Sequence, residues 1–428
     1  MPDFDLLIRG ATNQPFIAIA DGKFAGFTDG SAREAIDATG LLVFPGVIDA
    51  HVHFNEPGRA DWEGFATGSR ACAAGGTTTF FDMPLNAHPP TCDAASFDLK
   101  RAAAETQSFV DFALWGGLVP GNVDQLEALR DRVVVGFKAF MADSGIDDFP
   151  KVDFATLKAG MKRAAGLGLP VAVHAEIDHP ELRRGSTVRD FLASRPIKIE
   201  LEAIAAATEL AGETRCKLHV VHVSTARGVG LIAKARRCGV DVTCESCPHY
   251  LTLTAQEMVE IGAVAKCSPP LRTASAREGM IVRAMLGEVN TIGSDHSPAP
   301  MAMKTDADFF KVWGGISGCQ HLLALLYDLG LEAALITRLT AANVADRFGL
   351  ATRKGRFAAG LDADLVLLDP KARLRITAES LHYRHAHSPY VGRYLRGQVV
   401  RTVLRGQTVF ADGKHLGAPR GQLVRPRL

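Results

Sequence analysis

Signals for membranes, secretion and nucleic acids are missing from this sequence. No uninterrupted apolar run reaches the roughly 18 residues that a membrane-spanning helix needs. Residues 1–5 lack the basic and apolar regions with which a secretory signal begins. The formal net charge of +1 argues against a basic surface for nucleic acids or acidic membranes. We therefore expect a cytoplasmic protein with no nucleic-acid and no membrane partner.

A disulfide framework is not expected either. The eight cysteines are scattered through 428 residues without a secretory context, so we expect reduced thiols. Cys244 and Cys247 form a CxxC motif, but no second such pair exists, and we interpret it as neither a zinc knuckle nor a redox pair. The length, with 47% apolar and 22% charged residues, is typical of a soluble globular protein large enough for two domains.

Both ends of the chain predict short strands. Strands are expected at 6–10, 16–20 and 23–27 near the N-terminus, and at 363–368, 399–404 and 407–410 near the C-terminus. Asp21-Gly22 is typical of a tight hairpin turn. Neither end alone could bury a sheet face. We therefore expect one small β-sandwich domain, assembled from residues 1–45 and 350–428.

The middle of the chain, residues 46–349, alternates strand and helix patterns. Strands are expected near 47–53, 77–82, 109–115, 133–140, 170–174, 217–222, 240–246 and 291–295, and helices at 61–74, 122–131, 154–166, 200–212, 226–238 and 274–286. Asp61 is the expected N-cap of the first helix, and Gly75-Gly76 its end. This pattern predicts an α/β fold, a (β/α)8 TIM-type barrel. A doubly wound open sheet is the competing interpretation.

Two histidines lead the candidate site. His51 and His53 stand at the end of the first predicted barrel strand, after a Pro45-Gly46 turn. Because alternate residues of a strand point to the same side, their rings should project together. Neutral imidazole is a common ligand of divalent metals. The pair therefore indicates a metal site, with a surface strand that merely carries two histidines as the alternative.

Four further candidate ligands lie in or at the ends of later strands. They are Lys138 in the fourth strand, His174 after the fifth, His222 after the sixth and Asp295 after the eighth. The C-terminal ends of barrel strands form the catalytic face of this fold. For Lys138 the alternatives are an amine that snorkels to the surface and a buried, reactive amine with a lowered pKa. Together the six positions predict metal binding.

In order and approximate spacing, these residues resemble the metal ligands of the cyclic amidohydrolases, members of the amidohydrolase superfamily, and the resemblance spans nearly the whole chain. It implies two divalent ions, with zinc favoured over cobalt, manganese, iron or nickel, bridged by a carboxylated lysine. One ion would be held by His51, His53, Lys138 and Asp295, and the other by Lys138, His174 and His222. The implied reaction is hydrolysis of a cyclic amide by a metal-bridging hydroxide, with Asp295 as the acid–base group.

Other segments resemble the allantoinase branch of that family. They are residues 53–58, 61–65, 82–86, 137–140, 313–316 and 385–393. Dihydroorotases have Arg and His where this chain has Asn55 and Ala299, and those groups serve a carboxylate that allantoin lacks. The resemblance implies hydrolysis of allantoin to allantoate in purine degradation. Dihydroorotase-like and hydantoinase or dihydropyrimidinase activities are the alternatives.

The same resemblance implies Asn86, Ser268 and Ser297 as substrate contacts, although Asn86 could equally be a turn residue. The histidines within 382–387 are interpreted as structural or subunit-contact residues. We expect a small-molecule substrate and a homo-oligomer, either a homotetramer or a dimer. A non-enzymatic scaffold is disfavoured, because all six ligand positions are intact.

Overall fold

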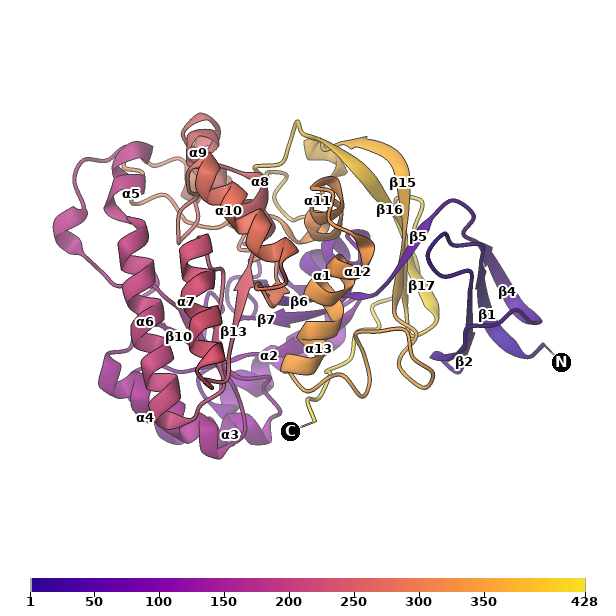
Figure 1. The fold of residues 1–428 in the computed structure, drawn as a ribbon, viewed down its shortest axis with the longest axis horizontal. Coiled ribbons are helices and arrows are strands. Elements are labelled where there is room, and N and C mark those ends of the chain that lie inside the picture. Colours follow the sequence, from indigo (N-terminus) through magenta and orange to yellow (C-terminus); the bar gives the residue numbers. More distant parts are fainter. Residues whose placement is uncertain (1, 428) are drawn as a thin grey trace.

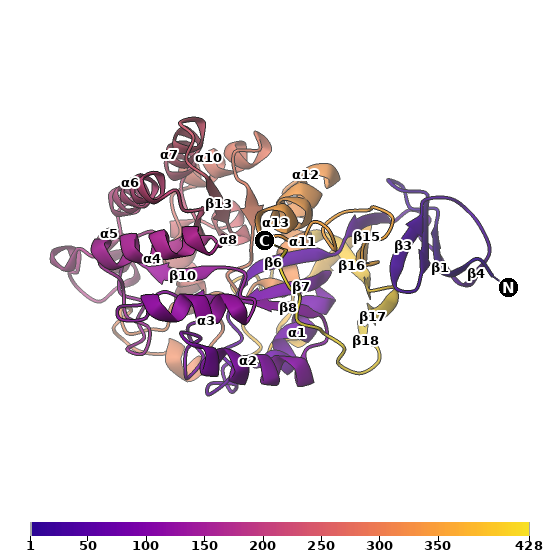
Figure 2. The ribbon, with the colours of Figure 1, turned by 90° about the horizontal axis from the view of Figure 1, so that it is seen from below.

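The computed structural model describes residues 2–427, and its middle part is a closed barrel of parallel strands (Figures 1 and 2). The barrel strands are β6 (Val47–Val52), β7 (Thr77–Asp82), β8 (Asp111–Leu114), β9 (Gly116–Gly117), β10 (Phe137–Phe140), β11 (Val171–His174), β12 (Leu218–Val220), β13 (Val242–Ser246) and β14 (Thr291–Ile292). β8 pairs with β7 and β9 with β10, so these two short strands share one position. The ring closes where Val52 bridges His296, just after β14. This closure confirms the barrel and excludes the open sheet.

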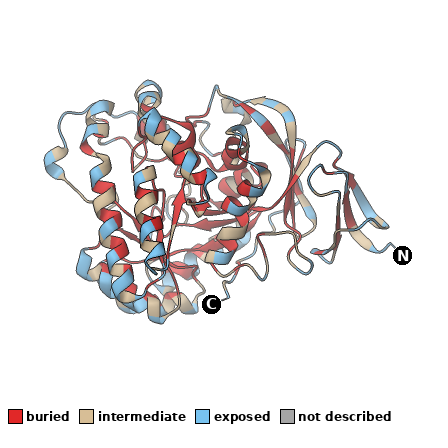
Figure 3. Cartoon of the chain, in the orientation of Figure 1, coloured by how far each residue is buried: buried red, intermediate tan, exposed pale blue. Residues whose placement is uncertain are grey.

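Helices surround the barrel, and their outward faces are exposed while the strands are buried (Figure 3). The surrounding helices are α1 (Phe65–Ala74), α2 (Ala94–Gln107), α3 (Leu126–Asp131), α4 (Phe154–Gly166), α6 (Ile197–Thr214), α7 (Ala226–Arg237), α10 (Ala274–Met285), α11 (Leu322–Asp328), α12 (Ala333–Thr337) and α13 (Asn343–Arg347). Three further helices lie between them in the sequence: α5 (Val188–Ser194), α8 (Pro248–Thr252) and α9 (Ala255–Ile261). No helix within residues 2–427 has both the length and the hydrophobicity to cross a bilayer.

The apolar core has an outer layer between strands and helices and an inner layer inside the barrel. Neighbouring residues of one strand enter different layers, for example Phe80 and Phe81 of β7, or Val171 and Ala172 of β11. This alternation follows from the two-residue period of strand side chains. It explains why these strands read as continuous apolar runs in the sequence, since both faces are buried.

Several predicted boundaries differ from the structure, and the physical reason is visible for two of them. Helix α1 begins at Phe65 and not at Asp61, because the carboxylate that accepts from the Phe65 N–H belongs to Glu56 (2.9 Å), in the loop after β6. Its C-terminal cap at Gly75 is as predicted. The fourth strand is also shorter than expected, because Val133 has a φ of 66° and ends a turn that follows α3.

The two ends of the chain form a β-sandwich beside the barrel. One sheet has the order β3-β2-β1-β4, from β1 (Phe4–Arg9), β2 (Phe16–Ala20), β3 (Lys23–Gly26) and β4 (Ala32–Asp37). The other has the order β18-β17-β16-β15-β5, from β5 (Leu42–Pro45), β15 (Leu365–Arg375), β16 (Tyr394–Leu404), β17 (Gln407–Ala411) and β18 (Lys414–His415). A shared apolar cluster joins the two sheets. The sandwich built from both termini is therefore confirmed, and the domain bounds 1–45 with 350–428, and 46–349, remain our prediction.

A buried ion cluster connects the barrel with the sandwich. The ammonium of Lys354, which is fully buried, lies 2.8 Å from a carboxylate oxygen of Asp111 at the start of β8 and also contacts Asp362 and Asp364 before β15. Arg405, after β16, pairs with Asp111 as well. Because carboxylates buried without a counter-charge are strongly unfavourable, this cluster should matter for stability.

Replacing Lys354 by Met should lower the stability of the protein by about 3–5 kcal/mol, since the substitution leaves three buried carboxylates short of a cation. The thermal unfolding midpoint measures the effect, with Lys371→Met, at an exposed position on β15, as the matched control. Equal midpoints for the two variants would contradict a stabilising role for the cluster.

Candidate metal centre

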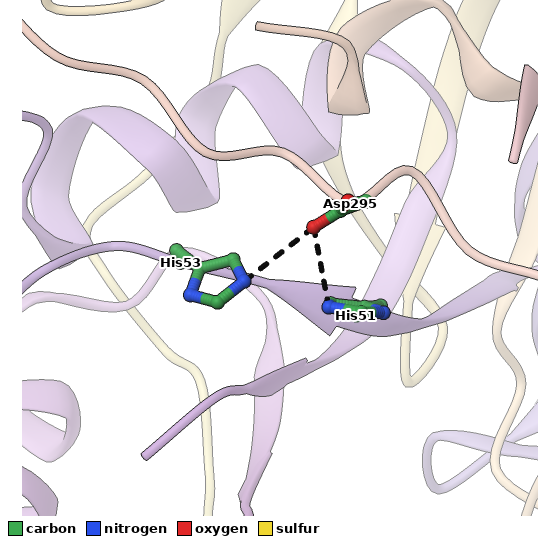
Figure 4. A group of neighbouring side chains, drawn as sticks. All are labelled: His51, His53 and Asp295. Carbon is green, nitrogen blue, oxygen red and sulfur yellow. Dashed lines mark ion pairs between the residues drawn. The ribbon is translucent and has the colours of Figure 1, made fainter. Parts of the chain in front are cut away.

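His51, His53 and Asp295 converge at the C-terminal end of the barrel (Figure 4). His51 belongs to β6 and His53 follows it, whereas Asp295 lies just beyond β14, which the ring closure places beside β6. Oδ1 of Asp295 is 3.2 Å from Nε2 of His51 and 3.5 Å from Nε2 of His53. One donor atom from each residue lies within 4.8 Å of the other two, which is a spacing that one cation could bridge.

A second pair of imidazoles stands next to this group. Nδ1 of His174, at the end of β11, is 3.1 Å from Nε2 of His222, which follows β12. The ring of His222 lies 5.5 Å from that of His51, measured between centroids. The five residues therefore form two adjacent sets of possible donor atoms.

Lys138 of β10 is fully buried, and its Nζ has no hydrogen-bond partner among the described residues. Burial lowers the pKa of this amine to about 8, although Asp295 and Glu245 act in the opposite direction. The surface-snorkelling alternative is therefore wrong for Lys138. A buried amine without a partner is costly, and a neutral amine reacts with CO2 to give an anionic carbamate. Such a carbamate, with the donors around it, fits a pair of divalent ions.

The electrostatics of the group favour the protonation states that metal ligands need. Burial lowers the pKa of His53 to about 4 and that of His222 well below its ordinary value. Burial alone would raise the pKa of Asp295, but His51 and the other imidazoles hold it well below its usual range. At neutral pH these imidazoles present free lone pairs, and Asp295 is an anion.

Two carboxylates behind the histidines were missed by the sequence analysis. Glu245 of β13 accepts from Nδ1 of His51 at 2.7 Å, and Glu176 accepts from Nε2 of His174 at 2.8 Å. Because a carboxylate only accepts, each histidine turns the lone pair of its other nitrogen toward the centre. Glu176 stands two residues after His174, a spacing that could have identified it. Glu245 lies inside the CxxC segment, where nothing marked it.

The backbone at the site is unusual at four positions. Asn55, Asn86, His222 and Asp295 all have positive φ values, of 65°, 67°, 41° and 47°, although none is a glycine. Conformations of this kind are unfavourable for residues with a side chain and cluster at functional sites. Each of these residues follows a barrel strand, so the sharp turns re-aim side chains at the strand ends.

A cavity of about 830 Å³ opens above the candidate ligands. Its lining includes the proposed substrate contacts Asn86, Ser268 and Ser297 as well as every candidate ligand except Lys138, which lies beneath. Nδ2 of Asn86 is 3.2 Å from Nδ1 of His53 and 3.5 Å from Oγ of Ser297. Asn86 is therefore both a turn residue with positive φ and part of the site.

Asn55 and Ala299, on which the comparison with dihydroorotases rested, do not line this cavity. Both are buried behind its wall, where Nδ2 of Asn55 lies 3.4 Å from the carbonyl oxygen of Pro298. His387 contacts the carbonyl of Ala299, and His385 contacts that of Asp61, each at 2.8 Å. These two C-terminal histidines thus make contacts within the chain, next to the loops that surround the site.

The chain belongs to the amidohydrolase family, whose sequence model matches residues 42–409. Within that family it is 54% identical to the allantoinase of Rubrobacter xylanophilus over 100% of this chain and 99% of the relative. It is 49% identical to the allantoinase of Solibacter usitatus, over 96% and 93% of the two chains. Its fold matches the L-hydantoinase (dihydropyrimidinase) of Arthrobacter aurescens with a TM-score of 0.95 and 33% identity, over 99% of this chain and 100% of that one. Family membership and the group around Asp295 together imply a metal centre.

Proposed function

We propose that this protein is an allantoinase, which hydrolyses the ring amide of allantoin to give allantoate. The observation that carries this proposal is the full-length similarity to allantoinases, at 54% and 49% identity. Hydantoinase or dihydropyrimidinase activity is the second candidate, supported by the shared fold at 33% identity. The same candidate ligands would serve both reactions, so the cavity above them decides the substrate.

The proposed cofactor is a pair of divalent ions, most simply zinc, bridged by a carboxylated Lys138. His51, His53 and Asp295 would hold one ion, and His174 and His222 the other. Two observations support this arrangement. The buried amine of Lys138 has no hydrogen-bond partner within the described residues, and Glu245 and Glu176 direct the lone pairs of two histidines. When bound, such ions polarise the carbonyl of the substrate and lower the pKa of a water molecule.

The protein's own residues would bind the substrate and move the proton. Asp295 lines the cavity, so its carboxylate can accept a proton from the attacking water and deliver it to the departing ring nitrogen. Asn86, Ser268 and Ser297 offer an amide and two hydroxyls, which suit the carbonyl and N–H groups of a ureidohydantoin. Asn86 also contacts His53, and would thereby orient substrate and ligand together.

Two of the cations that line the cavity, Arg195 and Lys266, already have partners within the chain, which favours a neutral substrate. The guanidinium of Arg195 lies 2.6 Å from a carboxylate oxygen of Glu176, and the amine of Lys266 donates to the carbonyl of Phe309 at 2.7 Å. A substrate carboxylate that approached Arg195 or Lys266 would have to compete with these partners, which is costly. Allantoin carries no carboxylate.

A panel of ring substrates tests the proposal. Metal-loaded protein should hydrolyse allantoin with a higher kcat/KM than hydantoin or dihydrouracil, because the ureido group of allantoin adds polar contacts in the cavity. Chromatography measures the formation of allantoate and the disappearance of hydantoin and of dihydrouracil, and these rates give the three kcat/KM values. A larger kcat/KM for hydantoin or dihydrouracil would favour the second candidate.

We further propose that the protein is a cytoplasmic homo-oligomer, a dimer or a tetramer. The free state of all eight cysteines supports a reducing compartment. Light scattering on the purified protein measures the number of subunits, and a monomer at micromolar concentration would refute this part of the proposal.

A further inference from the structure

The segment that follows β13 carries a histidine to which the reaction described above assigns no role. Glu245 near the end of β13 holds His51, and four residues later His249 lies in the first turn of α8. The cysteines of the CxxC motif that overlaps this segment, Cys244 and Cys247, are both buried free thiols. His249 is 1% exposed, and neither of its ring nitrogens has a hydrogen-bond partner among residues 2–427.

A buried imidazole without a partner is rare, because the polar atoms lose water and gain nothing in return. The groups around His249 limit which of them can be its hydrogen-bond partner. Donor atoms of Asp295, Cys247 and His249 lie within 4.8 Å of one another. The ring of Tyr250 packs 4.2 Å from that of His249, but its hydroxyl donates to the carbonyl of Pro269 at 2.6 Å. Cys247 offers only a weak sulfur acceptor, whereas Asp295 offers a charged one.

Asp295 has acceptor capacity to spare. Its Oδ1 faces His51 and His53, on the side of the candidate ligands. A carboxylate has two oxygens and about four acceptor sites, so contacts with two imidazoles and a cation leave capacity for another donor. A carboxylate held on one side only can rotate about its last bond, and a group that transfers a proton depends on its orientation.

We propose that His249 is a positioning residue for Asp295. When metal ions occupy the centre, a ring N–H of His249 donates a hydrogen bond to the carboxylate of Asp295. The inference rests on the proposed function, in which Asp295 is both a ligand and the acid–base group. The imidazole fixes the plane of the carboxylate and touches neither substrate nor ions. Its loss should therefore reduce kcat, with little change in KM or in the amount of bound metal.

The test compares two substitutions of His249 in metal-loaded protein. His249→Phe keeps a flat ring but removes both nitrogens, and it should lower kcat for allantoin about 10- to 100-fold, the range expected for a lost hydrogen bond to a charged group. His249→Gln keeps an N–H donor and should recover most of this loss. Equal kcat in His249→Phe and the parent, or equal losses in the two variants, would overturn the proposal. If the Phe variant does not fold, His249→Met, which also lacks a donor, replaces it in the comparison.

A double-mutant cycle separates positioning from a merely structural role. In an Asp295→Asn background, His249→Phe should have little further effect on kcat, because the group that it positions no longer acts as a base. A full additional loss would mean that His249 acts elsewhere in the protein, and the proposal would fail.

The visible spectrum of Co²⁺-loaded protein gives a readout that does not depend on substrate. His249→Phe should shift the absorption bands at unchanged Co²⁺ content, and His249→Gln should restore them. If the parent does not hydrolyse allantoin but the bands shift, the proposed function fails and the positioning role stands. If the parent is active and the bands do not shift, the positioning role fails alone.

Discussion

Lys138→Ala should lose most of its bound metal and nearly all of its activity. Lys138 is fully buried, its amine has no hydrogen-bond partner among residues 2–427, and the charges of Asp295 and Glu245 act on its pKa against the effect of burial. In the proposed centre its carbamate is the anion shared by two cations, and removing it leaves them to repel each other. The metal content measured by elemental analysis should fall from about two ions per chain to well below that, and kcat for allantoin should fall with it.

A matched control and a rescue experiment make this result specific. Lys162→Ala, at an exposed position on α4, should keep the metal content and kcat of the parent. A short carboxylic acid added with the metal should restore a small part of the activity of Lys138→Ala, since it can occupy the space that the side chain leaves. Two bound ions and full turnover in Lys138→Ala would contradict the binuclear centre.

Asp295→Asn should keep substantial metal while kcat falls by about 10²–10⁴-fold, the contribution typical of a positioned acid–base group. An amide can still offer an oxygen to a cation, but it cannot accept and return a proton at neutral pH. Asp131→Asn, at an exposed position in α3, is the control for the loss of one carboxylate. If Asp295→Asn turns over allantoin as fast as the parent, Asp295 has no part in proton transfer.

The barrel could be predicted from the sequence because the pattern of alternating strands and helices is local and repeated. Runs of apolar residues with both faces buried alternate with helical segments, and α4 (Phe154–Gly166) begins and ends where its pattern does. The predicted ends of helices and strands were wrong where tertiary contacts determine them. Asp61 is a suitable helix cap by type, but the N–H of Phe65 is bound by Glu56, nine residues away, and no local pattern reveals such a contact.

The candidate site likewise contains some residues that local sequence patterns reveal and others whose roles depend on tertiary contacts. The sequence pointed to six candidate ligands because they are polar residues in or directly after apolar strands, and the structure places the five imidazole and carboxylate groups among them close together. Glu245 and Asn55 could not be placed, since their roles depend on distant partners. Glu245 binds His51 from 194 positions away, and Asn55 lies behind the cavity wall against Pro298. The ring nitrogens of His249 have no hydrogen-bond partner in residues 2–427, so only its burial beside Asp295 points to a role.

The most direct test of the account is the ratio of kcat/KM for allantoin to that for dihydroorotate, measured on the metal-loaded parent protein. Both substrates present a cyclic amide to the same candidate ligands, but dihydroorotate adds a carboxylate. A buried carboxylate without a counter-ion costs several kcal/mol, and the nearby cations Arg195 and Lys266 are already engaged. We expect a ratio far above one. A ratio near or below one would contradict the proposal that this amidohydrolase acts on allantoin.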